Sequence, residues 1–150
     1  MSVLSIENLS LHYVTSRGRA RAVDGASISV ERAQMMGLVG ESGCGKTTLA
    51  RAITGVLPRS AEIAGGKIVF DGVDLLTLSR REMNRLRWRE ISFVPQSAMN
   101  SLDPVYRVGS QLMEVLTERG AMDKRAAKAR AAELFEMVGI GVDRLDDYPH

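Results

Sequence analysis

The sequence has little of what marks a secreted or membrane-spanning protein. Cys44 is the single cysteine among 150 residues, which excludes an internal disulfide and indicates a reducing compartment. No hydrophobic run approaches the length of a membrane span, and the first residues lack the basic region and long apolar stretch of a signal peptide. Twenty basic residues nearly balance 18 acidic ones, a balance too even to indicate nucleic-acid binding by itself. We therefore expect a soluble, cytoplasmic protein.

The polarity pattern predicts a mixed α/β portion followed by helices. Alternating polarity over 3–14 and 22–30, with a polar turn between them, predicts an antiparallel hairpin. The apolar runs 35–40 and 91–96 do not alternate and predict short strands covered on both faces, as in a parallel sheet. Residues 66–76 are predicted to form two short strands joined by a turn at Asp71-Gly72. Helices are predicted near residues 46–54, 79–89 with Ser79 as N-cap, 109–120 and 123–139.

The last of these helices carries an apolar face. Gly139 fits the position just after its end. The residues predicted to share the face are Ala127, Ala131, Leu134, Phe135 and Val138.

Residues 40–47, Gly-Glu-Ser-Gly-Cys-Gly-Lys-Thr, match the phosphate-binding pattern G-x-x-x-x-G-K-[ST]. The glycines let consecutive backbone N–H groups point inward, and a helix beginning near Lys46 adds its positive end. Lys46 can reach the β- and γ-phosphates, and the Thr47 hydroxyl can ligate Mg²⁺. A chance match is disfavoured by the apolar run before the loop and the helical pattern after it. The loop alone does not choose among ATPases, GTPases and kinases, although the [NT]-K-x-D motif of guanine specificity is absent from the sequence.

Two features allow a second interpretation. Cys44 lies near a helix N-terminus, where a thiol pKa tends to fall, but a small residue valued for its backbone is the favoured interpretation. The arginines of 80–89 could contact nucleic acid, yet Glu82 and Glu90 interleave with them and aromatics make up only 5% of the chain. A solvated helix face is favoured, and we expect no nucleic-acid partner.

Several stretches at defined distances from the loop together resemble the ATP-binding subunit of ABC transporters, and more closely the subunits that drive dipeptide and oligopeptide importers. The resemblance covers essentially the whole chain. It rests on AVDG, GESGCGKTT, FDGVDLLTLS, NSLDPVYRVGSQLMEVL and the final YPH. It implies an α/β P-loop NTPase fold, present here as its N-terminal portion with an antiparallel β segment and the start of a helical subdomain.

The resemblance also implies roles for particular residues. Tyr13 matches an aromatic that stacks on adenine, although from the sequence alone it could equally be an ordinary strand aromatic, and Val23 is expected beside the same ring. Gln96 matches a glutamine that reaches Mg²⁺ and the attacking water, so Thr47 and Gln96 are the expected metal ligands. The expected contacts to MgATP are Tyr13, Gly40, Glu41, Ser42, Gly43, Cys44, Gly45, Lys46, Thr47, Thr48 and Gln96.

The sequence departs from the family pattern in three places. Ala33-Gln34 replaces a Gly-Glu turn, which would cost about 1 kcal/mol if the turn requires a positive φ. Ser97-Ala98 replaces an acidic residue and proline. The chain ends at His150, ahead of the signature stretch, the Walker B aspartate, the catalytic glutamate and the switch histidine of the family. We therefore expect MgATP binding without appreciable hydrolysis, and an open edge where the Walker B strand would pair.

The expected organisation is an incomplete nucleotide-binding core over 1–96 and the start of a helical subdomain over 97–150. The resemblance implies membrane subunits as partners through about 97–118, a second ATP-binding subunit, and a place at the inner face of the cell membrane. The transported solute, whether peptide, nickel or another, is left open. The alternative interpretation is a non-catalytic nucleotide-binding module or a non-functional remnant.

Overall fold

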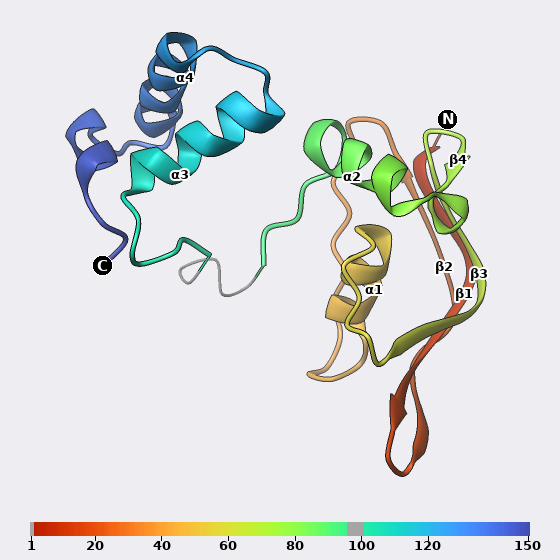
Figure 1. The fold of residues 1–150 in the computed structure, drawn as a ribbon. Helices are drawn as coiled ribbons and strands as arrows, with labels where there is room; N and C mark the ends of the chain where they lie inside the picture. The colour runs from red at the N-terminus through yellow and green to blue at the C-terminus, as the bar shows by residue number, and fades with distance from the viewer. Residues whose placement is uncertain (1, 96–100) are drawn as a thin grey trace. The chain divides into compact units, whose positions relative to one another are not determined.

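The computed structural model describes residues 2–95 and 101–150, which divide into two compact units, Met1–Phe93 and Val94–His150 (Figure 1). The first unit holds β1 (Ser2–Thr15), β2 (Gly18–Glu31), α1 (Lys46–Ile53), β3 (Ala61–Phe70), β4 (Val73–Asp74), a 3₁₀ turn (Leu75–Thr77) and α2 (Arg80–Arg89). The second holds α3 (Val108–Glu114), a π-helical turn (Val115–Arg119), α4 (Lys124–Met137) and a 3₁₀ turn (Val142–Asp146).

The first unit is built on a four-stranded antiparallel sheet in the order β2-β1-β3-β4. The predicted hairpin is confirmed, with Thr15 opposite Gly18 across a two-residue turn. The turn at Asp71-Gly72 is also confirmed, and both residues have positive φ, 46° and 83°, as a tight hairpin turn requires. The strand before that turn begins earlier than predicted, because β3 pairs along β1 from Ala61 onward.

The core of this unit lies between the sheet and α1, which runs along one face of the strands (Figure 1). Ile6, Leu9 and Ile68 are almost fully buried there, against Leu49 of α1. Ile6 and Leu9 are three residues apart and could not both face inward in a regular strand. A register shift between them, with Asn8 at φ 47°, returns Leu9 to the inner face.

Helix α2 begins with a capping box, which confirms Ser79 as the predicted N-cap. The Ser79 hydroxyl accepts from the Glu82 backbone, and the Glu82 carboxylate accepts from the Ser79 backbone N–H at 2.8 Å. The Ser79 hydroxyl also donates to this carboxylate at 2.6 Å, and chiefly through that bond it lowers the pKa of Glu82. The helix start is therefore fixed by its own local sequence.

The second unit is a small helical assembly. Ala131 and Phe135 of α4 pack with Leu145 of the 3₁₀ turn, and side chains of α3 complete this core. Gly109 allows α3 to approach the 3₁₀ turn closely, since a Cβ there would lie 2.7 Å from the Leu145 carbonyl oxygen. The predicted helix over 109–120 is present as α3 and the π-helical turn that continues it.

The two predicted short strands 35–40 and 91–96 are wrong over the residues that the structure describes. Residues 35–40 and 91–95 have no regular structure, and Met35, Val39 and Val94 are 97%, 92% and 81% exposed. A strand buried on both faces needs a neighbour on each side to pair its backbone groups. None of the strands β1–β4 pairs with either segment.

Val138 is a further correction. It was predicted to share the apolar face of the last helix, but it is exposed and follows the helix as its C-cap. Gly139 takes φ 74° directly after it, which confirms the predicted helix end. Because the chain leaves the helix at Val138, the helical spacing that placed this side chain on the buried face no longer applies there.

Candidate functional site

The loop before α1 requires glycine at two of its positions. Gly43 and Gly45 have φ values of 83° and 96°, in the left-handed region that side chains disfavour. A Cβ on Gly45 would also lie 2.2 Å from the carbonyl oxygen of Ala22 on β2. The loop is therefore seated against the edge strand of the sheet in a way that no larger residue permits.

The start of α1 leaves backbone donors available. Its first backbone bond runs from the Leu49 N–H to the Gly45 carbonyl at 2.9 Å, so the amides of residues 46–48 precede the helical bonding. Gly45 is the N-cap and provides no side-chain acceptor for them. Together with the positive end of the helix dipole, these amides form a place for an anion.

Lys46 lies across the loop that precedes it. Its Nζ donates to the Gly40 carbonyl at 2.8 Å and to the Glu41 carbonyl at 2.6 Å. The Cys44 Sγ is 3.4 Å from the same atom. The ammonium therefore bridges the loop close to the N-terminus of α1, where its charge and the helix dipole can attract the same anion. The donor set fits a phosphate chain, which offers several anionic oxygens at once.

The two threonines after Lys46 have different surroundings. Thr47 is exposed, so its hydroxyl is open to a metal ion carried by a bound ligand. Thr48 is buried, and its Oγ1 lies 3.1 Å from the hydroxyl oxygen of Tyr13 on β1. The structure therefore brings Tyr13 to the start of α1 from a position 35 residues away in sequence.

A cavity of about 440 Å³ opens between β2 and this loop. Val23 of β2 lines it together with Cys44, Gly45 and Lys46 of the loop and helix. Tyr13 is not among its lining residues. Leu38, Val39 and Leu49 also line the cavity, which is open toward solvent and leaves space for a ligand that contacts both the loop and β2.

The remaining predicted contacts are placed as follows. Gly40, Glu41, Ser42 and Gly43 are exposed on the loop. Gln96 and residues 97–100 lie outside the described residues. The described residues 101–118 contain α3 (Val108–Glu114). Val105 and Tyr106, which precede this helix, have exposed side chains.

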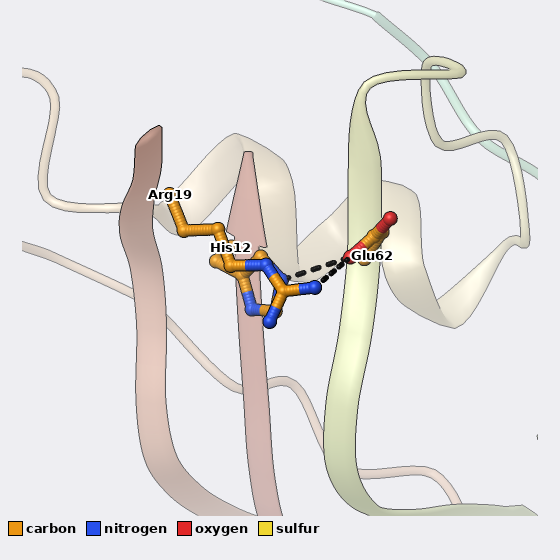
Figure 2. A network of polar contacts seen from close by, with 3 residues as sticks. All are labelled: His12, Arg19 and Glu62. Atoms are coloured by element: carbon orange, nitrogen blue, oxygen red, sulfur yellow. Dashed lines mark hydrogen bonds and ion pairs between the residues drawn. The ribbon is translucent and has the colours of Figure 1, made fainter. Parts of the chain in front are cut away.

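A polar network beside Tyr13 was not predicted from the sequence. His12 Nε2 lies 3.0 Å from Glu62 Oε2, and Arg19 Nη2 lies 3.5 Å from the same oxygen (Figure 2). These residues come from three different strands. Their meeting depends on the register of β3 against β1, which no local pattern in the sequence reveals.

Within residues 2–95 and 101–150, no helix is long and apolar enough to cross a membrane.

The sequence is similar to those of known transport proteins along its whole length. The chain is 39% identical to a dipeptide transport ATP-binding protein, DppD, of Bacillus subtilis and 37% identical to the DppD protein of Escherichia coli. The matches cover 99% and 100% of this chain, but 45% and 46% of those relatives. The chain therefore spans slightly less than half the length of these curated relatives.

Solved structures share the fold. The ATP-binding cassette MJ0796, in a dimeric post-hydrolysis state bound to ADP and phosphate, matches with a TM-score of 0.82 at 21% identity, over 97% of this chain and 61% of that one. The cbiO1 protein of Clostridium perfringens, part of the transporter complex cbiONQ, matches with a TM-score of 0.73 at 25% identity, over 97% and 53%. The family model described as ABC transporter matches residues 23–149. The loop pattern of residues 40–47, the fold and above all the family model over residues 23–149 show that the chain belongs to the ABC transporter family.

Proposed function

We propose that this chain binds MgATP as the N-terminal portion of an importer ATPase that energises the uptake of peptides or similar small solutes. The observation that carries the proposal is the loop before α1, where free amides, the helix N-terminus and Lys46 act on one position. The similarity to dipeptide transport ATP-binding proteins supports the peptide class.

In this proposal each part of the site has one task. The amides of residues 40–48 hold the phosphate oxygens, and Lys46 exchanges carbonyl contacts for the β- and γ-phosphates. The exposed Thr47 hydroxyl and Gln96 hold Mg²⁺, which supplies charge neutralisation when it is bound with the nucleotide. Tyr13 offers a face for the adenine ring, with Val23 beside it.

The proposed partners are the membrane subunits of a transporter and a second ATP-binding subunit. We assign contact with the membrane subunits to about residues 97–118, and the exposed Val105 and Tyr106 support this assignment. Gln111 holds their turn in shape, because its side chain bonds to the backbone of Asp103 and to the Tyr106 carbonyl, each within 3.0 Å. The chain would then act at the inner face of the membrane through those partners.

We further propose that residues 1–150 by themselves bind nucleotide without appreciable turnover. The loop, Thr47 and Gln96 hold phosphate and metal, whereas phosphoryl transfer also needs a group that polarises the attacking water, which the family resemblance assigns to a glutamate outside residues 1–150. The second candidate function is a nucleotide-binding module without catalysis, regulatory or remnant, and it makes the same binding prediction.

The test is binding of a fluorescent ATP analogue with Mg²⁺ to the wild type, to Lys46→Ala and to Lys67→Ala, with phosphate release followed in the same samples. Lys67 is an exposed lysine of β3 and serves as the matched control. We expect saturable binding that Lys46→Ala abolishes and Lys67→Ala retains. Equal binding by all three folded proteins would overturn the proposal, and Lys46-dependent phosphate release would overturn the claim of no turnover.

A further inference from the structure

Tyr13 occupies the last position at which three strands of the sheet pair side by side. It lies opposite Ala20 of β2 and opposite Ala61 of β3. Beyond it a backbone hydrogen bond from the Val14 N–H to the Ser60 carbonyl ties β1 to the segment before β3, and the hairpin of β1 and β2 continues to its turn. A two-stranded ribbon is marginally stable in water, so the end of the three-stranded region would fray unless other contacts hold it.

On the face toward α1, one such contact is the pair of hydroxyls. The Tyr13 hydroxyl and Thr48 Oγ1 are 3.1 Å apart in a partly buried place, and either group can donate. Thr48 lies two residues after Lys46, so this bond links the tyrosine ring directly to the helix whose amides face the phosphate site. A hydrogen bond away from bulk water restricts the ring more than an exposed one would.

On the opposite face, the carboxylate of Glu62 is the second contact. Successive side chains of a strand point to opposite faces, so His12 points away from the face of Tyr13. There one carboxylate oxygen of Glu62 contacts both His12 and Arg19 (Figure 2). These contacts link β1, β2 and β3 next to the position of Tyr13 in the strand register. The His12 side chain is only 13% exposed, while Glu62 is 50% exposed. The contacts of Glu62 therefore hold the three strands together at the end of the three-stranded region.

We propose that Thr48 and Glu62 are positioning residues that hold Tyr13 in a fixed place relative to the phosphate-binding loop before the nucleotide arrives. This inference rests on the proposed function. A ring that is already ordered loses less conformational freedom when a base stacks on it, and binding is tighter for that reason. The two contacts therefore act on the part of the affinity that depends on the base, and leave the part that depends on phosphate unchanged.

The experiment compares two ligands by calorimetry: the Mg²⁺ complexes of adenylyl imidodiphosphate and of tripolyphosphate, which has a phosphate chain but no base. Tyr13→Phe keeps the ring and removes the bond to Thr48, and Glu62→Gln removes the carboxylate charge from the network. We expect each variant to bind the nucleotide analogue about three- to ten-fold more weakly and tripolyphosphate within two-fold of wild type. Glu62→Asp should recover part of the loss.

Asp71→Asn is the matched control, because Asp71 is also an exposed acid that pairs with an arginine, Arg32, but it lies beyond the far end of β3. It should bind both ligands as the wild type does. The inference is overturned if Tyr13→Phe or Glu62→Gln weakens the binding of both ligands equally, or if one of these variants binds the nucleotide analogue as tightly as the wild type. Neither result would affect the proposal of MgATP binding. Failure of the folded wild type to bind the nucleotide analogue overturns the proposed function and the inference with it.

Discussion

Ala33 lies in the turn between β2 and the segment that leads to the phosphate-binding loop, at φ 59°. Its neighbour Gln34 closes the turn, since its backbone N–H donates to the Glu31 carbonyl and its side-chain oxygen accepts from the Glu31 N–H at 2.7 Å. A residue with a Cβ is strained in the left-handed region. We predict that Ala33→Gly raises the free energy of unfolding of this unit by about 0.5–1 kcal/mol, measured by urea denaturation.

The same exchange at Ala129 provides the control, because Ala129 is exposed on α4 in a helical conformation. Glycine in a helix interior costs about 1 kcal/mol relative to alanine, so the stability change should have the opposite sign. Destabilisation by both exchanges would show that the turn at Ala33 carries no strain.

At the scale of elements, Arg87 of α2 caps the C-terminal end of α1. Its guanidinium donates to the carbonyls of Thr54 and Gly55, both at 2.6 Å, and to Asn84 Oδ1 at 2.7 Å. A cation at the C-terminal end of a helix satisfies carbonyls that have no helical partner. We predict that Arg87→Ala lowers the free energy of unfolding by about 1–3 kcal/mol, measured by chemical denaturation.

Arg85 on the same helix is exposed and serves as the comparison. Its replacement by alanine should change stability by less than about 0.5 kcal/mol. If the two variants lose the same stability, the contacts of Arg87 to the end of α1 contribute nothing beyond a surface arginine.

The capping box of α2 makes stability depend on pH. Hydrogen bonds from Ser79 hold the pKa of Glu82 below its usual value of 4.5. The charged form is thus favoured in the folded state, so this stabilisation is full above that usual value and disappears as the pH falls through the lowered pKa. We predict that wild type is more stable than Glu82→Gln at pH 7 and that the difference shrinks below about pH 4.5. Thermal unfolding at several pH values measures it, and a constant difference down to pH 3 would contradict it.

Elements defined by local signals could be predicted, and elements defined by distant partners could not. Ser79, Asp71-Gly72 and Gly139 mark a helix start, a turn and a helix end through their own backbone preferences, and the structure confirms all three. Segments 35–40 and 91–95 carry apolar side chains, but none of the described strands β1–β4 pairs with them, so their apolar sequence led to a wrong strand prediction. The role of Arg87 was missed because it depends on α2 lying beside the end of α1.

At the scale of the whole molecule, the same distinction holds for the candidate site. Residues 40–48 are consecutive, so one stretch of sequence predicts the complete phosphate-binding loop. The approach of Tyr13 to Thr48 and the network around Glu62 join distant segments through the sheet, and only the fold reveals them.

The most direct test of the central claim is amide hydrogen exchange with and without the Mg²⁺ complex of adenylyl imidodiphosphate. If the amides of residues 40–48 hold the phosphates, their exchange should slow markedly when the analogue is bound, and this slowing should be lost in Lys46→Ala. Unchanged exchange over residues 40–48 at saturating analogue would contradict the account.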